Sequence, residues 1–137
     1  MHPAIRLVFV LHDHQPVGNF HDVIEDAYQK SYLPFLKLLQ QHSTIRIALH
    51  TSGPLAEWLE MNHPEYLNQL SSLAAAQQIE IVCGGFSEPI LAMLPSRDRI
   101  GQIRQYNRWL EQRLQTTVTG MWICLLYTSP SPRDRVQ

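Results

Sequence analysis

The sequence is poor in cysteine and has no surplus of charge of either sign. Only Cys83 and Cys124 occur among its 137 residues, without a Cys-x-x-Cys pair or a Cys/His cluster, which excludes a disulfide framework and a structural zinc site. The 11 Lys and Arg residues offset 12 Asp and Glu residues, so the formal net charge is −1. Proteins that grip nucleic acid through its phosphates carry a basic excess. We therefore expect no nucleic-acid partner, and the few cysteines predict a reducing, cytoplasmic compartment.

Long apolar runs are also missing. The first strongly apolar stretch, residues 7–11, is far shorter than the ~20 residues that span a bilayer, and no small-residue cleavage site follows it. We expect no membrane span, no membrane partner and no export signal. Hydrophobic residues make up 45% of the chain and charged residues 17%, which is typical of a globular protein and disfavours disorder.

Short β-rich runs alternate with longer helical stretches along the chain. The β-rich runs cover residues 5–11, 45–49, 79–82 and 118–123. Their spacing leaves room for a crossover helix each time, so we expect four parallel strands joined by three crossover helices. Pro34, Pro54 and Pro64 are expected near helix starts, because proline fits the first helical turn. Ser96 is expected to cap the third crossover helix. The predicted fold class is α/β.

Polar side chains follow the first strand directly. His12 and His14 alternate with Asp13, so both imidazoles point to one face if the strand continues, and Asp13 points to the other. Paired imidazoles suit hydrogen bonding to sugar hydroxyls or metal ligation, and Gln15 follows beside them. The alternative is that one of them is a core histidine that hydrogen-bonds a backbone carbonyl. The residues themselves leave both interpretations open.

The later strands also run into polar segments, and α/β folds gather their chemistry at the carboxyl ends of strands. The second strand leads into residues 50–53, and the third into Gly-Gly at 84–85, which allows close backbone approach and aims Glu88 outward. Glu88 could bind a hydroxyl or act as an acid or base; the alternatives are a helix start or a surface ion pair. Trp122 ends the fourth strand and could stack on a sugar ring, or simply pack in the core.

Three segments together carry a family resemblance: residues 11–16 (LHDHQP), 52–59 (SGPLAEWL) and 80–91 (EIVCGGFSEPIL). They resemble the amino-terminal third of glycoside hydrolase family 57, in the right order, over about residues 4–123. The resemblance implies a partial parallel (β/α)7 barrel that acts on α-glucan or maltooligosaccharide with retention of configuration, as α-amylases and 4-α-glucanotransferases do. It implies no cofactor and no metal. The residues expected to bind substrate are His12, His14, Gln15, Glu88 and Trp122.

The sequence departs from the family pattern after the fourth strand. Family members continue through one further residue into the nucleophilic Glu and an Arg, whereas this chain reads Cys124-Leu125-Leu126. Leu125 thus stands at the nucleophile position, and the acid/base Asp of the family belongs to a later strand. A retaining mechanism needs both carboxylates. We expect residues 1–123 to be the amino-terminal part of a catalytic barrel, residues 124–137 to be a divergent, non-native tail, and the chain as written to be inactive.

Two other functions stay open. A metal-dependent carbohydrate enzyme, similar to mannosidases and polysaccharide deacetylases, would use His12, Asp13 and His14 in a divalent-metal site. It fits less well, because Gln15 and Glu88 belong to segments of the family pattern. A non-catalytic sugar-binding fragment would bind maltooligosaccharide without turnover. Four strands of an unclosed barrel would leave an exposed edge, which favours aggregation of the isolated piece.

Overall fold

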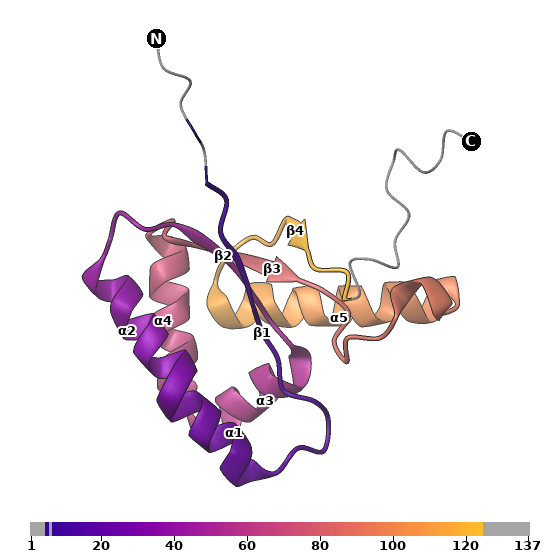
Figure 1. Ribbon diagram of the computed structural model, residues 1–137. Coiled ribbons are helices and arrows are strands. Elements are labelled where there is room, and N and C mark those ends of the chain that lie inside the picture. Colours follow the sequence, from indigo (N-terminus) through magenta and orange to yellow (C-terminus); the bar gives the residue numbers. More distant parts are fainter. Residues whose placement is uncertain (1–4, 6, 125–137) are drawn as a thin grey trace.

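Four parallel strands form the centre of the protein. The computed structural model describes residue 5 and residues 7–124. The strands pair in the order β1-β2-β3-β4, all parallel, which confirms the predicted α/β class (Figure 1). Their bounds are β1 Val10–Asp13, β2 Ile47–Thr51, β3 Ile79–Cys83 and β4 Gly120–Met121.

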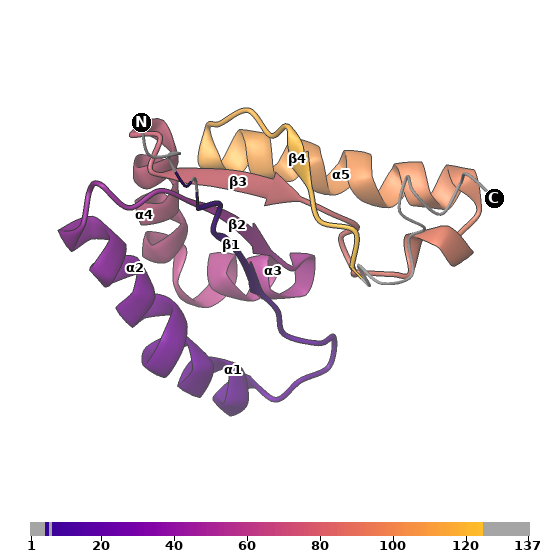
Figure 2. The same cartoon turned by 45° about the horizontal axis from the view of Figure 1, so that its top comes forward.

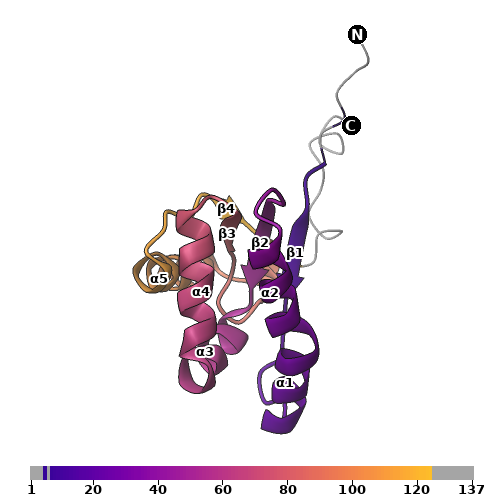
Figure 3. The same cartoon turned by 90° about the vertical axis from the view of Figure 1, so that its left-hand side faces the viewer.

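More helices join the strands than the three expected. The first crossover contains α1 His21–Ala27, the π-helical turn η1 Tyr28–Tyr32 and α2 Leu33–Gln41; the second contains α3 Gly53–Asn62 and α4 Pro64–Ala75; the third contains the 3₁₀ turn η2 Leu91–Met93 and α5 Ser96–Leu114. In Figure 3, α4 and α5 lie toward the end of the sheet formed by β3 and β4, and both helices contact β3. None of the helices in the described part of the chain is long and apolar enough to cross a membrane.

The prolines act largely as predicted. Pro54 lies in the first turn of α3, and α4 begins at Pro64. Pro34 lies in the first turn of α2, but α2 continues η1 without a gap. Because proline has no N–H to donate to the carbonyl four residues earlier, a regular α-helix is broken at this point, and the wider π turn precedes it. The predicted cap of α5 was wrong by one residue: Pro95 is the N-cap, and Ser96 is the first helical residue.

The core lies between the sheet and the helices. Ile47 and Leu49 of β2 and Ile79 and Ile81 of β3 alternate toward the helices and are buried there. Each fully buried leucine or isoleucine stabilises the fold by roughly 1.5–3 kcal/mol. The largest fully buried helical side chains they join include Tyr28, Tyr66, Tyr106, Leu36, Leu39, Leu55 and Leu67.

The first strand is shorter than predicted. A strand over residues 5–11 was expected, but β1 begins at Val10. Leu7 and Val8 are 83% and 80% exposed, so they have little surface against which to pack. A strand is stabilised by packing on its neighbours rather than by backbone preference alone, so the ladder does not extend to these residues. β1 lies at the end of the sheet order, where the expected exposed edge is present.

Gln78 closes the carboxyl end of α2. Its side chain is buried, and its Nε2 donates to the carbonyl oxygens of Leu39 at 2.6 Å and His42 at 3.0 Å. Carbonyls in the last turn of a helix have no later N–H partner in the helix. Each carbonyl also accepts a backbone N–H, Leu39 from His42 and His42 from Ile45. We expect Gln78→Met to lower the free energy of unfolding by about 1 kcal/mol, because the side-chain hydrogen bonds are lost and the backbone ones remain. Urea denaturation measures this, with the exposed Gln41→Met as the control. Equal midpoints for the two variants would contradict the prediction.

Candidate functional site

Three histidines and a glutamate meet at the carboxyl ends of the strands, which run in the same direction in Figure 2. His12 of β1 lies opposite His50 of β2 in the parallel register. His14 follows β1 by one residue, and Glu88 lies in the segment between β3 and η2. We call His12, His14, His50 and Glu88 the His-Glu cluster.

Glu88 is the centre of the His-Glu cluster. Its Oε2 lies 2.6 Å from Nδ1 of His14, and its Oε1 lies 3.3 Å from Nε2 of His12 and 3.4 Å from Nδ1 of His50. The Nδ1 atoms of His12 and His50 are 2.8 Å apart and share a hydrogen bond. The Glu88 side chain is 8% exposed and that of His14 is 40% exposed. The carboxylate is therefore covered, and His14 is the member of the cluster that faces solvent.

Burial and neighbouring charge determine which groups are ionised. Burial raises the pKa of Glu88, but the adjacent imidazoles of His12, His14 and His50 together lower it further, so the net pKa is below its ordinary value. Burial, together with the nearby His12, lowers the pKa of His50 to about 4. At neutral pH the cluster therefore combines an ionised carboxylate with a neutral, buried imidazole.

The segment after β3 brings Glu88 inward. A Cβ on Gly84 would lie 2.7 Å from Nε2 of His50, and a Cβ on Gly85 would lie 2.7 Å from Cδ of Pro89, so both positions need glycine. Glu88 itself has a left-handed backbone with φ 51°, which costs a non-glycine residue about 1–2 kcal/mol. Glu88 is thus neither a helix start nor a surface ion pair, and the expectation that it points outward was wrong.

Trp122 covers the His-Glu cluster from the end of the fourth strand. Its ring stacks on His12 with centroids 4.7 Å apart and 13° between the planes, and its centroid is 6.0 Å from that of His50. Its backbone N–H donates to the carbonyl of Cys83 at 2.7 Å, which holds the residue beside β3. The structure thus gathers His12, His14, Glu88 and Trp122 at one place.

Gln15 lies outside this group. Its Nε2 donates to the hydroxyl of Tyr32 at 2.9 Å, and its Oε1 accepts from Nδ2 of Asn19 at 2.7 Å. The first of these hydrogen bonds ties the loop after β1 to η1, and the second lies within the loop, so Gln15 stabilises the loop. The position assigned to the missing nucleophile, Leu125, lies outside the described residues.

Sequence reasoning missed His50 as a site residue. It was recognised only as part of a polar segment after the second strand, yet it is fully buried and contacts both His12 and Glu88. The signal that could have found it is the strand register, since aligning the two apolar runs as parallel neighbours places the two histidines side by side. Its role depends on that pairing and not on any local motif.

Asp13 points away from the His-Glu cluster, as the alternation along the strand predicts. It lies near Tyr32 and Tyr66 on the helix side, where its charge raises the pKa of both hydroxyls in addition to the larger effect of burial. In the described part of the chain, the group able to hold a metal ion is His12, His14 and Glu88, whose ligand atoms lie within 4.8 Å of one another. The metal-dependent alternative had included Asp13, whereas in the structure Glu88 takes that place beside His12 and His14.

The environment of Asp13 makes stability depend on pH. Burial raises the pKa of Asp13 from 3.8 to about 6, against a smaller opposing effect of His12. Between these values the folded state holds a proton that the unfolded state has lost, so the free energy of unfolding falls as pH rises through 6. We expect Asp13→Asn to be more stable than the parent by about 2 kcal/mol at pH 7 and similar to it at pH 4. Urea denaturation at both pH values measures this. The exposed Asp22→Asn is the control, and it should not become more stable than the parent between pH 4 and pH 7.

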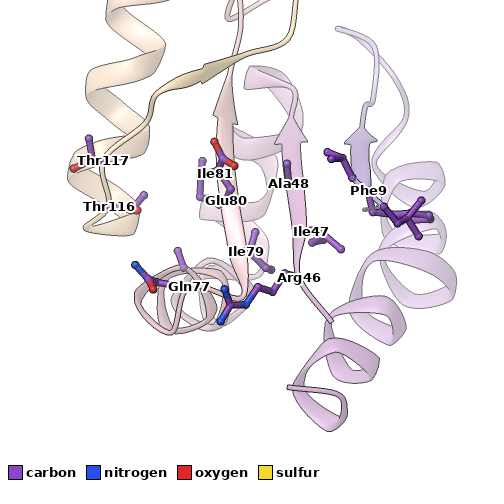
Figure 4. Close-up of a pocket in the computed structure, with 13 residues that line it drawn as sticks. Phe9, Arg46, Ile47, Ala48, Gln77, Ile79, Glu80, Ile81, Thr116 and Thr117 are labelled. Atoms are coloured by element: carbon purple, nitrogen blue, oxygen red, sulfur yellow. The ribbon is translucent and has the colours of Figure 1, made fainter. Parts of the chain in front are cut away.

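A cavity of about 680 Å³ lies at the opposite end of the strands (Figure 4). Ile47 and Ile79, the first residues of β2 and β3, line it together with Phe9 and Arg46. No member of the His-Glu cluster is among its lining residues in the described part of the chain. The titratable groups that act together are therefore at the carboxyl ends of the strands and not in this cavity.

A comparison with protein families decides the membership of the chain. The model of glycosyl hydrolase family 57 matches residues 8–131. The chain belongs to glycosyl hydrolase family 57. The predicted family and the predicted partial parallel barrel are therefore confirmed, and the four strands with their helices are the portion of the family 57 fold seen here.

Other family 57 proteins match most of this chain. The α-amylase of Pyrococcus furiosus is 46% identical over 123 residues, which cover 90% of this chain and 19% of that protein. The solved structure of 4-alpha-glucanotransferase from Thermococcus litoralis has a TM-score of 0.82 at 43% identity, covering 85% of this chain and 18% of that one. A family 57 branching enzyme from Pyrococcus horikoshii, at 14% identity and a TM-score of 0.69, shares the fold over 84% of this chain and 33% of its own. The chain spans less than a fifth of the length of the curated relatives it matches.

Proposed function

We propose that this chain is the part of a retaining α-glucan hydrolase or 4-α-glucanotransferase that holds a glucose unit of the substrate at the His-Glu cluster. The observation that supports this most strongly is the ionised Glu88 carboxylate, 2.6 Å from the partly exposed His14, at the carboxyl end of a parallel sheet. Carboxylates and imidazoles accept and donate the hydrogen bonds that sugar hydroxyls make. The relatives named α-amylase and 4-alpha-glucanotransferase support an α-glucan or maltooligosaccharide as the substrate.

The His-Glu cluster binds substrate and does not itself cleave the glycosidic bond. Because Nδ1 of His14 faces Glu88, its Nε2 on the far side of the ring is available to a sugar hydroxyl. Trp122 supplies an aromatic surface beside them, which suits the apolar face of a pyranose. A retaining reaction needs two carboxylates about 5–5.5 Å apart, and Asp13 points to the other face of the sheet. The nucleophile and the acid/base therefore come from elsewhere in the enzyme.

The domain assignment is part of the same proposal. Residues 1–123 are the barrel portion, and residues 124–137 are not native to the enzyme, because Leu125 stands where the nucleophilic Glu is expected. The family match continues to residue 131, eight residues past Ile123. The proposed boundary at Ile123 therefore depends on the mismatch at Leu125 alone. Reading the genomic DNA across codon 124 tests it, and the same tail found in frame would contradict it.

The low cysteine content supports a cytoplasmic location.

Sugar binding by the 137-residue chain tests the function of the His-Glu cluster. We expect maltoheptaose to shift the NMR signals of His14 and Trp122 in a saturable way, with no release of reducing sugar. Cellohexaose, which has β-linkages and one glucose unit fewer, is the control and should bind at least about tenfold more weakly, a difference of about 1.4 kcal/mol. A folded chain whose spectrum does not change with maltoheptaose would contradict the proposal.

Metal binding is the second candidate, because the ligand atoms of His12, His14 and Glu88 lie within 4.8 Å of one another. Two histidines and one carboxylate are a known zinc-ligand set. The family 57 membership favours the sugar site instead. Calorimetric titration with Zn²⁺ separates the two, since stoichiometric binding that His14→Ala abolishes would support the metal site.

A further inference from the structure

We propose that His50 is a positioning residue for the sugar site, which fixes the tautomer of His12 and so directs the Nε2–H of His12 toward Glu88. This inference rests on the proposed function of the His-Glu cluster. His50 is fully buried, so it cannot touch a substrate itself. It acts on the substrate only through the orientation of His12 and Glu88.

The hydrogen bond between the two histidines couples their tautomers. It joins Nδ1 of His12 to Nδ1 of His50 at 2.8 Å. A neutral imidazole carries one proton, on either Nδ1 or Nε2, so one ring donates through Nδ1 and the other accepts at Nδ1. The accepting ring must then carry its own proton on Nε2. The bond therefore allows two arrangements of the neutral pair, which differ in the ring that donates.

The surroundings of the two Nε2 atoms select one arrangement. Nε2 of His50 is buried without a hydrogen-bond partner among the described residues, and a Cβ on Gly84 would lie only 2.7 Å from it. A proton on that atom would be a buried donor with no acceptor, which is unfavourable. Nε2 of His12, in contrast, lies 3.3 Å from Oε1 of Glu88, where a proton faces a carboxylate. Both environments favour His50 as the donor and His12 as the acceptor.

The result is an ordered chain of groups that ends at the carboxylate. His50 donates to His12, and His12 presents its N–H toward Oε1 of Glu88, while Nδ1 of His14 lies 2.6 Å from Oε2. Oε1 is buried and lacks a well-aligned hydrogen bond, and the ring nitrogens nearest to it are Nε2 of His12 at 3.3 Å and Nδ1 of His50 at 3.4 Å. In the arrangement inferred here both nitrogens carry a proton, so both attract the carboxylate. If His12 adopted the other tautomer, a lone pair would face the carboxylate. Glu88 would then be repelled from the position in which a sugar hydroxyl could meet it.

The tautomers can be read directly in the 137-residue chain without any sugar. Long-range ¹H–¹⁵N NMR distinguishes a protonated from a bare ring nitrogen. We expect His12 to be protonated on Nε2 and His50 on Nδ1. The reverse assignment would overturn the inference. Because this measurement needs no ligand, its failure is distinct from a failure of the chain to bind maltoheptaose, which would contradict the proposed function alone.

Two amide variants separate positioning from packing. Asparagine places its side-chain nitrogen where Nδ1 of histidine lies, whereas glutamine reaches the position of Nε2. We expect His50→Asn to bind maltoheptaose within about threefold of the parent and His50→Gln to bind at least about tenfold more weakly. The exposed His42→Asn is the control for loss of a histidine. Equal affinity of His50→Asn and His50→Gln would show that His50 only fills space.

A second variant perturbs His50 without changing it. Gly84→Ala places a methyl group 2.7 Å from Nε2 of His50 and 2.9 Å from the carbonyl oxygen of Trp122, so it should move the His50 ring away from His12 and disturb Trp122 as well. We expect it to weaken maltoheptaose binding at least as much as His50→Gln does, by about tenfold. Binding of maltoheptaose by Gly84→Ala as strong as by the parent would overturn the inference. If His50→Gln does not unfold cooperatively, its loss of binding reflects loss of the fold. The tautomers of His12 and His50 in the parent chain then test the inference.

Discussion

Glu88→Gln is expected to lower the affinity for maltoheptaose by about 30-fold or more, corresponding to about 2 kcal/mol. An amide has one acceptor oxygen and one NH₂ group in place of two acceptor oxygens. Oε1 and Oε2 both face imidazole nitrogens, so either orientation of the amide sets an NH₂ group against a ring nitrogen, at 2.6 Å in the case of His14. The charge that attracts a hydroxyl donor is lost as well. Isothermal titration calorimetry measures the effect, with the exposed Glu57→Gln as the matched control.

Glu88→Gly separates the binding role of this side chain from its effect on folding. Glycine adopts the left-handed backbone at position 88 without the strain that glutamate has there. We therefore expect Glu88→Gly to lose maltoheptaose binding while retaining, or slightly gaining, free energy of unfolding. If Glu88→Gln and Glu88→Gly both bind like the parent, the His-Glu cluster is not the sugar site.

Gly53→Ala is expected to lower the free energy of unfolding by about 3 kcal/mol or more, the largest effect on stability among the changes considered. A Cβ at Gly53 would lie 2.3 Å from Cδ2 of Phe86 and 2.4 Å from its carbonyl oxygen. That oxygen accepts the backbone N–H of Gly53 at 3.0 Å, so the methyl group separates α3 from the segment after β3. Phe86 packs edge-on against the buried Tyr106, whose hydroxyl donates to the carbonyl of Thr51. The clash therefore extends to the end of β2, and overpacking of this kind is costly.

Gly101→Ala is the matched control for Gly53→Ala. Gly101 lies within α5, and a Cβ there would meet nothing within 4 Å. Alanine is the better helix former, so this variant should be more stable than the parent by about 0.5–1 kcal/mol. Urea denaturation of both variants gives the comparison. If both substitutions change the free energy of unfolding only slightly, the contact between α3 and Phe86 is not important for stability, which would contradict the prediction.

The parts of the fold that were predictable have strong local signals. The β-branched runs at β2 and β3 were placed within two residues, and Pro54 and Pro64 marked the starts of α3 and α4. The start of β1 was not predictable from its sequence, because Leu7 and Val8 are apolar but have little to pack against. Composition favoured a strand there, and the absence of a packed neighbour decided against it.

The site was predictable where it depends on strand periodicity and not where it depends on turns or register. Alternation along β1 correctly separated His12 and His14 from Asp13. The inward direction of Glu88 follows from a left-handed φ that no residue-type rule would assign to glutamate. Gln15 was expected beside the histidines, but hydrogen bonds to Tyr32 and Asn19 hold it in its loop.

The order of the strands bears on how the protein assembles during its synthesis. Val10 pairs with Ala48, Ile47 with Ile79 and Val82 with Gly120, so each pairing closes over fewer than about 40 residues of chain. No strand of the described sheet must wait for a distant segment, and the sheet can grow in one direction as the chain leaves the ribosome at roughly 5–20 residues per second. The pairing of β1 with β2 brings together His12 and His50, both of which precede Glu88 in the chain. The carboxylate is therefore contributed by a later segment of the chain than the two imidazoles that it meets.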